Sequence, residues 1–146
     1  LPFLNYKGGE RVYDDSQMSA GRIIFVSKAF PQAGSNTVIE PCETKPGGGK
    51  SWLNMLDALS GKRLAESFYN VDAQGKTEPV LVKNASGDLV ATSSKAIEGV
   101  ATGPAISKGK DNVDYILVGN ANTGSINTFA MKASSSRQSW RQLDTK

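Results

Sequence analysis

Short apolar runs broken by glycine are the feature that most limits what this chain can fold into. Fifteen glycines interrupt the 146 residues, and few windows keep the i, i+3, i+4, i+7 apolar spacing of an amphipathic helix. The runs between them are rich in β-branched and aromatic residues, as in residues 22–27 (Arg-Ile-Ile-Phe-Val-Ser), and such residues favour strands. We therefore expect an all-β chain of short antiparallel strands joined in hairpins.

Further strands and turns follow from the same signals. The other expected strands are residues 37–40, 51–56, 80–83, 89–92, 115–118 and 125–131. Residues 84–88 (Asn-Ala-Ser-Gly-Asp) are expected to close a hairpin, because these are turn-forming residues. Residues 31–50 are expected to form a long loop and residues 133–146 a C-terminal tail, within a single β-rich segment that covers residues 1–146.

The residue types present exclude several classes of enzyme. The chain contains no histidine, which removes most zinc enzymes, the Ser-His-Asp hydrolases and the Cys-His proteases. Its one cysteine, Cys42, can form neither an intrachain disulfide nor a thiolate metal site, and its neighbours supply no cation to activate it. Cys42 is then either a half-buried or loop thiol or the partner of a cysteine outside this chain.

Two motifs that could carry chemistry do not meet its requirements. Gly49-Lys50-Ser51 matches only the end of a phosphate-binding loop, and a strand rather than a helix is expected after it. The closest carboxylate pairs, Asp14–Asp15 and Asp111–Asp114, lie in polar, loop-like stretches, and nothing places them across a cleft as a glycosidase requires. We predict no enzyme activity and no catalytic, cofactor-binding or metal-site residues.

A weak calcium site is the one exception that the sequence suggests. The loop from Asn70 to Gly75 has oxygen-bearing side chains at its first, third and fifth positions and glycine at its sixth, as in an EF-hand. Position twelve is Leu81 instead of glutamate, and Lys76 adds a positive charge nearby. The alternative is an ordinary polar turn.

Charge and hydropathy limit the partners. The net charge is +3, from 17 basic and 14 acidic residues, and the basic residues are scattered instead of gathered on one stretch. Nucleic-acid binding needs a concentrated positive face, so no nucleic-acid partner is expected. The longest apolar runs, such as residues 23–26, are far shorter than the roughly 18 residues of a membrane-spanning helix, so we expect no membrane-spanning segment.

The segment 52–64 (Trp-Leu-Asn-Met-Leu-Asp-Ala-Leu-Ser-Gly-Lys-Arg-Leu) carries the most specific pattern. A strand is expected to end near Asp57, whose carboxylate can accept hydrogen bonds from turn N–H groups. Gly61 can adopt the positive φ that the turn needs, and a second strand is expected from Lys62. A weaker turn of the same kind lies at residues 122–126. Gly61 and Gly124 are 63 residues apart, which exceeds one propeller blade of about 40–50 residues, and an insertion at 68–79 could supply the excess.

These stretches resemble a known family. Residues 21–25, residues 51–61 after Pro41-Cys42 and a glycine-rich stretch, and the terminal residues 137–143 (Arg-Gln-Ser-Trp-Arg-Gln-Leu) are together similar to the C-terminal end of the PilY family, the type IV pilus tip adhesin and biogenesis proteins. The resemblance implies a quinoprotein-like β-propeller of about seven blades. At most about three blades fit in 146 residues, so we expect two to three antiparallel blades of an incomplete propeller.

The resemblance also implies a function without catalysis. It suggests a binding and structural module of a pilus-associated adhesin, which supports pilus extension versus retraction, adhesion and twitching motility. The implied location is the cell surface or pilus tip, with the periplasm or outer membrane in transit. The implied partners are other pilus components or a host surface, and the rest of the parent propeller, with the loop at residues 31–50 as the expected contact region.

Two alternatives to this function stay open. One is a propeller scaffold of the outer-membrane assembly type, and the other is a fragment of a quinoprotein-like enzyme. Trp52 and Trp140 are expected to pack between sheets, although an exposed tryptophan could also bind a ligand.

Overall fold

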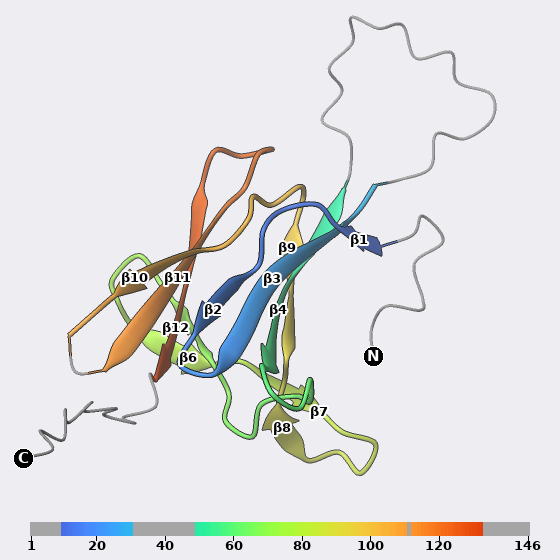
Figure 1. Ribbon diagram of the computed structural model, residues 1–146, viewed down its shortest axis with the longest axis vertical. Helices are drawn as coiled ribbons and strands as arrows, with labels where there is room; N and C mark the ends of the chain where they lie inside the picture. Colours follow the sequence, from blue (N-terminus) through green and yellow to red (C-terminus); the bar gives the residue numbers. More distant parts are fainter. Residues whose placement is uncertain (1–9, 31–48, 111, 133–146) are drawn as a thin grey trace, which may run out of the picture.

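The computed structural model describes residues 10–30, 49–110 and 112–132, and every regular element within them is an antiparallel strand (Figure 1). The described residues contain no helix, so the all-β prediction is confirmed. The strands are β1 (Glu10–Val12), β2 (Gln17–Ser19), β3 (Arg22–Ala29), β4 (Lys50–Asp57), β5 (Tyr69–Val71), β6 (Thr77–Pro79), β7 (Leu81–Lys83), β8 (Leu89–Ala91), β9 (Ser94–Glu98), β10 (Ala105–Lys108), β11 (Val113–Gly119) and β12 (Ile126–Lys132).

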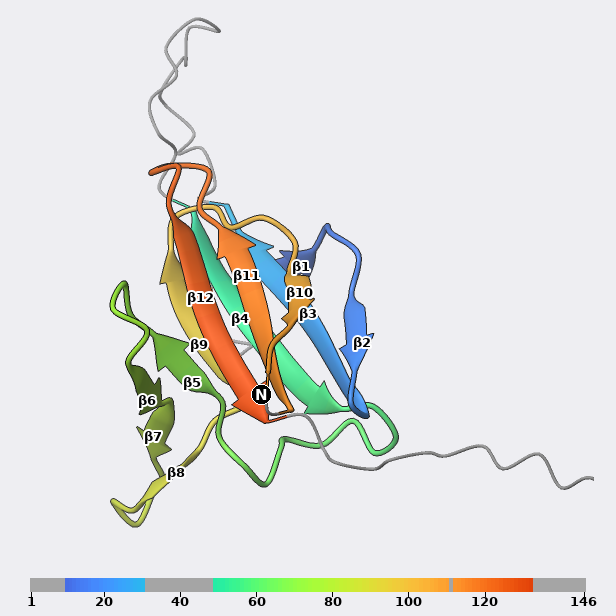
Figure 2. The same ribbon diagram turned by 90° about the vertical axis from the view of Figure 1, so that its left-hand side faces the viewer.

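The strands form two five-stranded sheets and one hairpin. Sheet A has the order β1-β3-β4-β9, and β2 pairs with the first half of β3 while β1 pairs with its last residues. Sheet B has the order β10-β11-β12-β5-β6, and β7 and β8 pair only with each other. Figure 2 looks onto sheet B, with sheet A behind it.

The chain crosses between the sheets more than once. After β4 it leaves sheet A, adds β5 and β6 to the edge of sheet B, forms the β7–β8 hairpin, and returns to place β9 beside β4. This excursion is longer than the insertion expected at residues 68–79, since it covers the whole stretch between the turn after β4 and β9. It ties the two sheets together, because each contains strands from both sides of the crossing.

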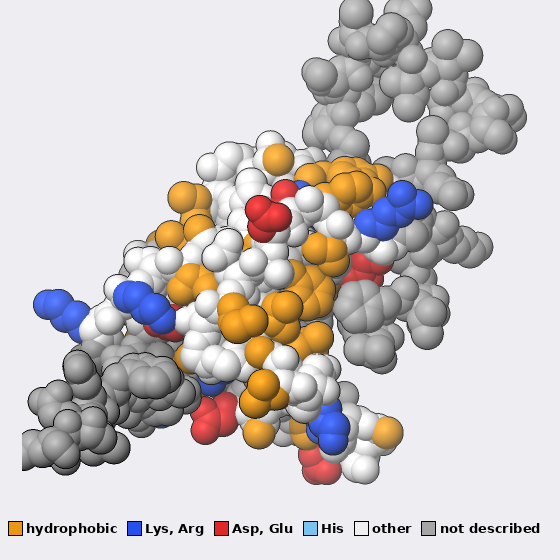
Figure 3. Space-filling model, in the orientation of Figure 1, with side chains coloured by type: hydrophobic (Ala, Val, Ile, Leu, Met, Phe, Trp, Pro, Cys, Tyr) orange, Lys and Arg blue, Asp and Glu red, His pale blue; other side chains and the backbone are white. Residues whose placement is uncertain are grey.

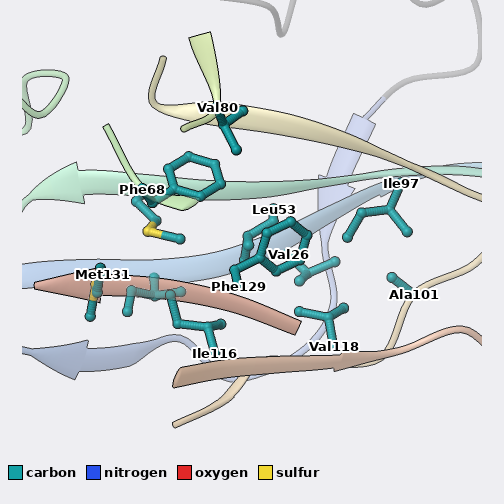
Figure 4. Close-up of a cluster of buried hydrophobic side chains, with 12 residues drawn as sticks. Val26, Leu53, Phe68, Val80, Ile97, Ala101, Ile116, Val118, Phe129 and Met131 are labelled. Atoms are coloured by element: carbon teal, nitrogen blue, oxygen red, sulfur yellow. The ribbon is translucent and has the colours of Figure 1, made fainter. Parts of the chain in front are cut away.

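The hydrophobic core lies between sheets A and B (Figure 4). Alternate residues of the long strands point into it, because successive side chains of a strand face opposite sides of the sheet. Phe68 and Phe129 meet there edge to face, with ring centroids 5.8 Å apart. The core residues are Ile24, Val26, Leu53, Met55, Phe68, Val80, Ile97, Ala101, Ile116, Val118, Phe129 and Met131. Burying one large apolar side chain here contributes about 1.5–3 kcal/mol.

A polar cluster joins the two sheets at the side where β2 approaches β10. The buried carboxylate of Asp114 accepts hydrogen bonds from the Ser19 hydroxyl at 2.7 Å and from Lys108 Nζ at 2.8 Å. Burial raises the pKa of Asp114, but the hydrogen bonds from Lys108 and Ser19 and the positive charges of Lys108 and Arg22 outweigh it, so the pKa lies below its ordinary value. The cluster therefore holds an ionised carboxylate that fixes β2 of sheet A against sheet B.

Four turns among the described residues begin with the same pair, Asp or Asn followed by Ala. In each, the oxygen of the first side chain accepts hydrogen bonds from N–H groups within the turn, as an Asx turn does. Each also contains a glycine with positive φ, such as Gly61 at 64° and Gly124 at 68°. The turns begin at Asp57, Asp72, Asn84 and Asn120.

The expected strands and turns are largely confirmed within the described residues. β3, β4, β11 and β12 match the expected runs, and the hairpin closed by residues 84–88 joins β7 to β8. The strand expected from Lys62 is wrong, since only Arg63 pairs with β4, by an isolated bridge to Leu56. The sequence does not predict the strands that are short and lack a clear apolar run, which are β1, β2, β5, β6, β9 and β10. The strand expected at residues 37–40 lies outside the described residues.

Candidate docking surfaces

The outer face of sheet A, which points away from the core, is rich in apolar side chains. Ile23 of β3 lies between Met18 of β2 and Leu56 of β4, its partners in register. Phe25 and Trp52 follow on the same face, and both are partly buried. Met18 is 72% exposed. We call this surface, formed by Met18, Ile23, Phe25, Trp52 and Leu56, the outer face of sheet A.

Polar groups at the centre of this face are already paired. Ser27 and Asn54 are almost fully buried, and Asn54 Nδ2 donates a hydrogen bond to Ser27 Oγ at 2.8 Å. Ser27 Oγ in turn donates to the Glu10 carboxylate. A partner that covered the face would therefore leave these donors satisfied, which avoids the main cost of burying polar groups.

The outer face of sheet B has the same character. Its apolar side chains alternate with the core residues of β11 and β12, and the register places Tyr115 beside Ala130, which in turn lies beside Tyr69 of β5. Ile126, at the start of β12, is 68% exposed. The outer face of sheet B is formed by Tyr69, Val71, Val113, Tyr115, Leu117, Ile126 and Ala130.

Two adjoining hollows lie at one end of this face. The first measures about 290 Å³ and is lined by Tyr69, Thr77, Val113, Ala130, Met131 and Lys132. The second measures about 310 Å³ and is lined by Glu66, Ser67, Tyr69 and Lys132. Because the two hollows share Tyr69 and Lys132, they form one depression with an apolar part and a polar part, which we call the β5–β12 groove.

Apolar residues on both outer faces are unusual for a pack of two sheets that stands alone. In such sandwiches the outward positions of each strand are mostly polar. In the view of Figure 3, hydrophobic side chains form a band across the middle of the molecule, where Figure 1 shows β3, whereas the Lys and Arg side chains lie toward the margins. Contiguous exposed apolar surface of this kind marks interaction sites.

The β7–β8 hairpin adds a third apolar surface. Leu81, Val82 and Leu89 are 39%, 43% and 63% exposed, respectively. The hairpin pairs with neither sheet, and an isolated two-stranded hairpin is only marginally stable in water. It therefore stands beside the two-sheet pack with its apolar side chains accessible.

The structure accounts for several residues that the sequence singled out. Asp57 occupies its turn as predicted, with Oδ1 accepting from Ser60 N at 2.7 Å and Leu59 N at 3.2 Å. The hydrogen bonds from the Ser60 N–H and the Ser60 hydroxyl are the main causes that lower the pKa of Asp57. Trp52 lies partly buried on the outer face of sheet A. Cys42, Trp140 and the loop at residues 31–50, apart from Gly49 and Lys50, lie outside the described residues.

Residues considered for chemistry have structural partners. Ser51 is the second residue of β4, and its hydroxyl donates a hydrogen bond to Gly99 O and accepts one from Ala101 N. Asp14 forms an ion pair with the buried Lys28, and Asp114 belongs to the polar cluster between the sheets. Their carboxylates are thus committed to separate cations, Lys28 and Lys108.

The loop proposed for calcium forms an Asx turn between β5 and β6. Asp72 Oδ1 accepts hydrogen bonds from Lys76 N at 2.7 Å and Gln74 N at 3.0 Å. Within residues 10–30, 49–110 and 112–132, no three or more His, Cys, Asp or Glu side chains are grouped so that they could hold a metal ion. Calcium binding at Asn70–Gly75 stays a prediction.

The two outer faces and the groove are not predicted by the sequence. One sequence signal could have revealed them: in β11, apolar residues occupy both odd and even positions, for example Tyr115 and Ile116, so both faces of the strand carry apolar side chains. Which parity faces the core is decided only by the pairing of the sheets.

Comparison of the chain with protein-family models, curated proteins and solved structures finds no match. Among the described residues, no helix is long and apolar enough to cross a membrane. The fold and its surfaces thus define an all-β chain whose two antiparallel sheets each carry an apolar outer face.

Proposed function

We propose that this chain is a non-catalytic binding and structural module, a two-blade part of a larger quinoprotein-like β-propeller in a type IV pilus-associated protein of the PilY kind. Its two sheets act as neighbouring blades, and their outer faces pack against further blades or docked pilus components. In that role it supports pilus biogenesis, adhesion and twitching motility at the cell surface. The pilus assignment comes from the sequence resemblance at residues 21–25, 51–61 and 137–143.

The single observation that carries the structural part of this proposal is the apolar outer face on each sheet. A propeller blade packs against a neighbour on both sides, so both of its faces are apolar. A closed sandwich needs only one apolar face per sheet. A longer stack of sheets would bury the apolar side chains of both outer faces, such as Phe25 on sheet A and Tyr115 on sheet B. In a closed sandwich of two sheets they would stay exposed to water.

Strand order gives a second line of support. Sheet A contains the antiparallel series β2-β3-β4-β9 and sheet B the series β10-β11-β12-β5. The first strands of the two series lie side by side, where Ser19 of β2 meets Lys108 of β10. Blades of a propeller likewise place their corresponding innermost strands next to one another around the central channel.

The test places one charge on the outer face of sheet A in the full-length protein of the source organism. The substitution Phe25→Lys should reduce surface pili and twitching motility, because a lysine cannot be buried cheaply against an apolar partner. Ser86→Lys is the matched control, since Ser86 is exposed in the turn between β7 and β8 and lies on neither outer face. It should leave piliation unchanged.

The same two variants in the isolated chain separate folding from function. Circular dichroism should show β structure in both, because Phe25 lies outside the core cluster. Normal piliation and motility with Phe25→Lys would contradict the proposal. A measurable substrate turnover or a bound redox cofactor in the full-length protein would favour the quinoprotein-like enzyme instead.

A further inference from the structure

The ion pair between Lys28 of β3 and Asp14 of the β1–β2 connection holds a lysine in an unusual place. Lys28 is only 9% exposed, and it follows Ile24 and Val26, two core residues, on the same side of β3. A lysine is almost never buried to this extent without an anionic partner. Because both charges have left water, the pair carries a desolvation cost that its own attraction need not repay.

The contact between the two side chains differs from an ordinary hydrogen bond. Lys28 Nζ lies 2.5 Å from Asp14 Oδ2, whereas a charge-assisted N–H···O bond is about 2.7–2.9 Å long. Oδ2 is buried, yet within the described part of the chain no hydrogen bond reaches it. Because a carboxyl C–O bond is about 1.2 Å long, Nζ lies at most about 3.7 Å from Asp14 Cγ. The amine is therefore close to the distance at which reacting atoms meet.

Gly103, in the connection from β9 to β10, closes the pair from one side. A Cβ at Gly103 would lie 2.9 Å from Asp14 Cβ and 3.4 Å from Asp14 Cγ, so the backbone at this position packs directly on the carboxyl group. A larger residue would push Asp14 away. The amine and the carboxyl group are thus held together and partly shielded from water, which are conditions that favour a reaction between them.

We propose that Lys28 and Asp14 join in an isopeptide bond, an amide between the lysine Nζ and the aspartate Cγ. One ammonium proton passes to Oδ2, and the freed electron pair of Nζ attacks Cγ. A second proton passes to the same oxygen as the Cγ–Oδ2 bond breaks, and one water leaves. The ammonium and the carboxylate supply every atom of the products, so no oxidant, reductant or other reactant takes part. A neutral amide replaces two buried charges, which removes their desolvation cost.

The bond would secure the first strand of sheet A. β1 is held to β3 by only three register pairs, between Glu10–Val12 and Ser27–Ala29. The cross-link joins the connection that follows β1 to Lys28 in the middle of this pairing. β1 could then not separate far from β3 when the chain is pulled or partly unfolded. The modification goes beyond the proposed function and does not depend on it.

Mass spectrometry of the full chain tests the proposal directly. The intact, denatured chain should be lighter than its sequence by the mass of one water. Trypsin cleaves after Arg22 but not after an acylated lysine, so a digest should contain residues 12–22 joined to the peptide that holds Lys28. Tandem spectra should place the link between Asp14 and Lys28. A chain of full sequence mass that trypsin cleaves after Lys28 would overturn the proposal.

Single variants identify the two reacting groups. Lys28→Met keeps a long side chain without an amine, and Asp14→Ala removes the carboxyl group, so each should have its full sequence mass. Asp15→Ala removes the neighbouring exposed carboxylate and is the matched control, which should still lose one water. Loss of water in Lys28→Met would overturn the proposal, because it would then come from a succinimide at an aspartate.

The digest of the unaltered chain gives a decision even if a variant fails to fold, because it identifies the linked residues without any substitution. A link that joins Lys28 to another carboxyl group would also overturn the proposal. None of these results bears on the Phe25→Lys piliation test, so failure of this inference is distinguishable from failure of the proposed function.

Discussion

The turns at Asp57–Lys62 and Asn120–Ser125 have the same local structure but lead to different strands. In both, the first side-chain oxygen accepts hydrogen bonds from the N–H groups two and three residues on. In both, the glycine N–H donates to the first carbonyl, at 2.9 Å for Gly61 and 2.8 Å for Gly124. After Gly124 the chain forms β12, which pairs with β11 along its whole length. After Gly61 it pairs with β4 only at Arg63.

What differs is where the segment that follows buries its apolar side chains. β12 brings Phe129 and Met131 into the core. After Gly61, Leu64 packs against the core and Phe68 enters it, but neither belongs to a strand that pairs with β4. The place beside β4 is taken by β9, whose Ile97 enters the core. The comparison teaches that turn chemistry reverses the chain, whereas burial decides which strand occupies the sheet.

Removing the apolar anchor of β9 should have the largest effect. Ile97→Ala should lower the free energy of unfolding by about 2–4 kcal/mol, because Ile97 is a buried core residue and its loss leaves a cavity. Arg63→Ala should change it by less than about 0.5 kcal/mol, as for other exposed positions. Urea unfolding monitored by circular dichroism measures both. Equal losses of unfolding free energy for the two variants would mean that the chain after Gly61 contributes as much to stability as β9 does, which contradicts the prediction.

The next largest effect is expected when Asn120, whose side-chain oxygen accepts the hydrogen bonds of its turn, is replaced by aspartate, the residue at the same position of the turn after β4. Asn120 also donates Nδ2–H to the carbonyl of Glu98 at 2.6 Å, and it is 8% exposed. Asn120→Asp replaces this donor by an acceptor, so it should cost about 2–3 kcal/mol through a lost and unsatisfied hydrogen bond. Asn84→Asp, in the exposed turn of the β7–β8 hairpin, is the control and should be close to neutral. A neutral Asn120→Asp would show that the two turns are interchangeable.

The two turn glycines should respond alike. Gly61→Ala and Gly124→Ala should each cost about 1 kcal/mol, because both glycines have positive φ that alanine adopts only with strain. A new Cβ would meet nothing within 4 Å at either position, so no clash adds to this cost. Thermal unfolding of the two single variants provides the comparison. A much larger loss at one position would show that the strands, not the turns, set the cost.

The smallest effect concerns pH and distinguishes an aspartate turn from an asparagine turn. Hydrogen bonds from Ser60 lower the pKa of Asp57, so the folded state binds a proton less readily than the unfolded chain. The contribution of the Asp57 carboxylate to folding stability is fully present above the pKa of an unfolded aspartate, and it is lost as pH falls through the lower pKa of the folded state. Tm measured from neutral to acid pH should therefore show wild type above Asp57→Asn at neutral pH, with the difference closing in acid. A difference that stays constant would show that the charge of Asp57 does not matter.

Local sequence signals account for most of the individual strands and turns. Glycine spacing, β-branched runs and turn residues predicted an all-β chain, the strands β3, β4, β11 and β12, and the Asp57 and Asn84 turns. These features depend on neighbours within a few residues, because φ preferences and Asx hydrogen bonds are local. The short strands β5, β9 and β10 carried too weak a pattern to be found, since their pairing is stabilised by distant partners.

Which strands share a sheet, and which faces remain uncovered, depends on how the two sheets assemble. Lys62 follows a well-formed turn yet starts no strand, while Ser94–Glu98 fills that place from more than 30 residues further along the chain. Apolar residues occur at both parities of β11, and nothing in its sequence tells Ile116, which is buried, from Tyr115, which is not. The choice is made when two sheets meet and bury one face of each, because hydrophobic burial is non-directional and depends on all the surfaces brought together.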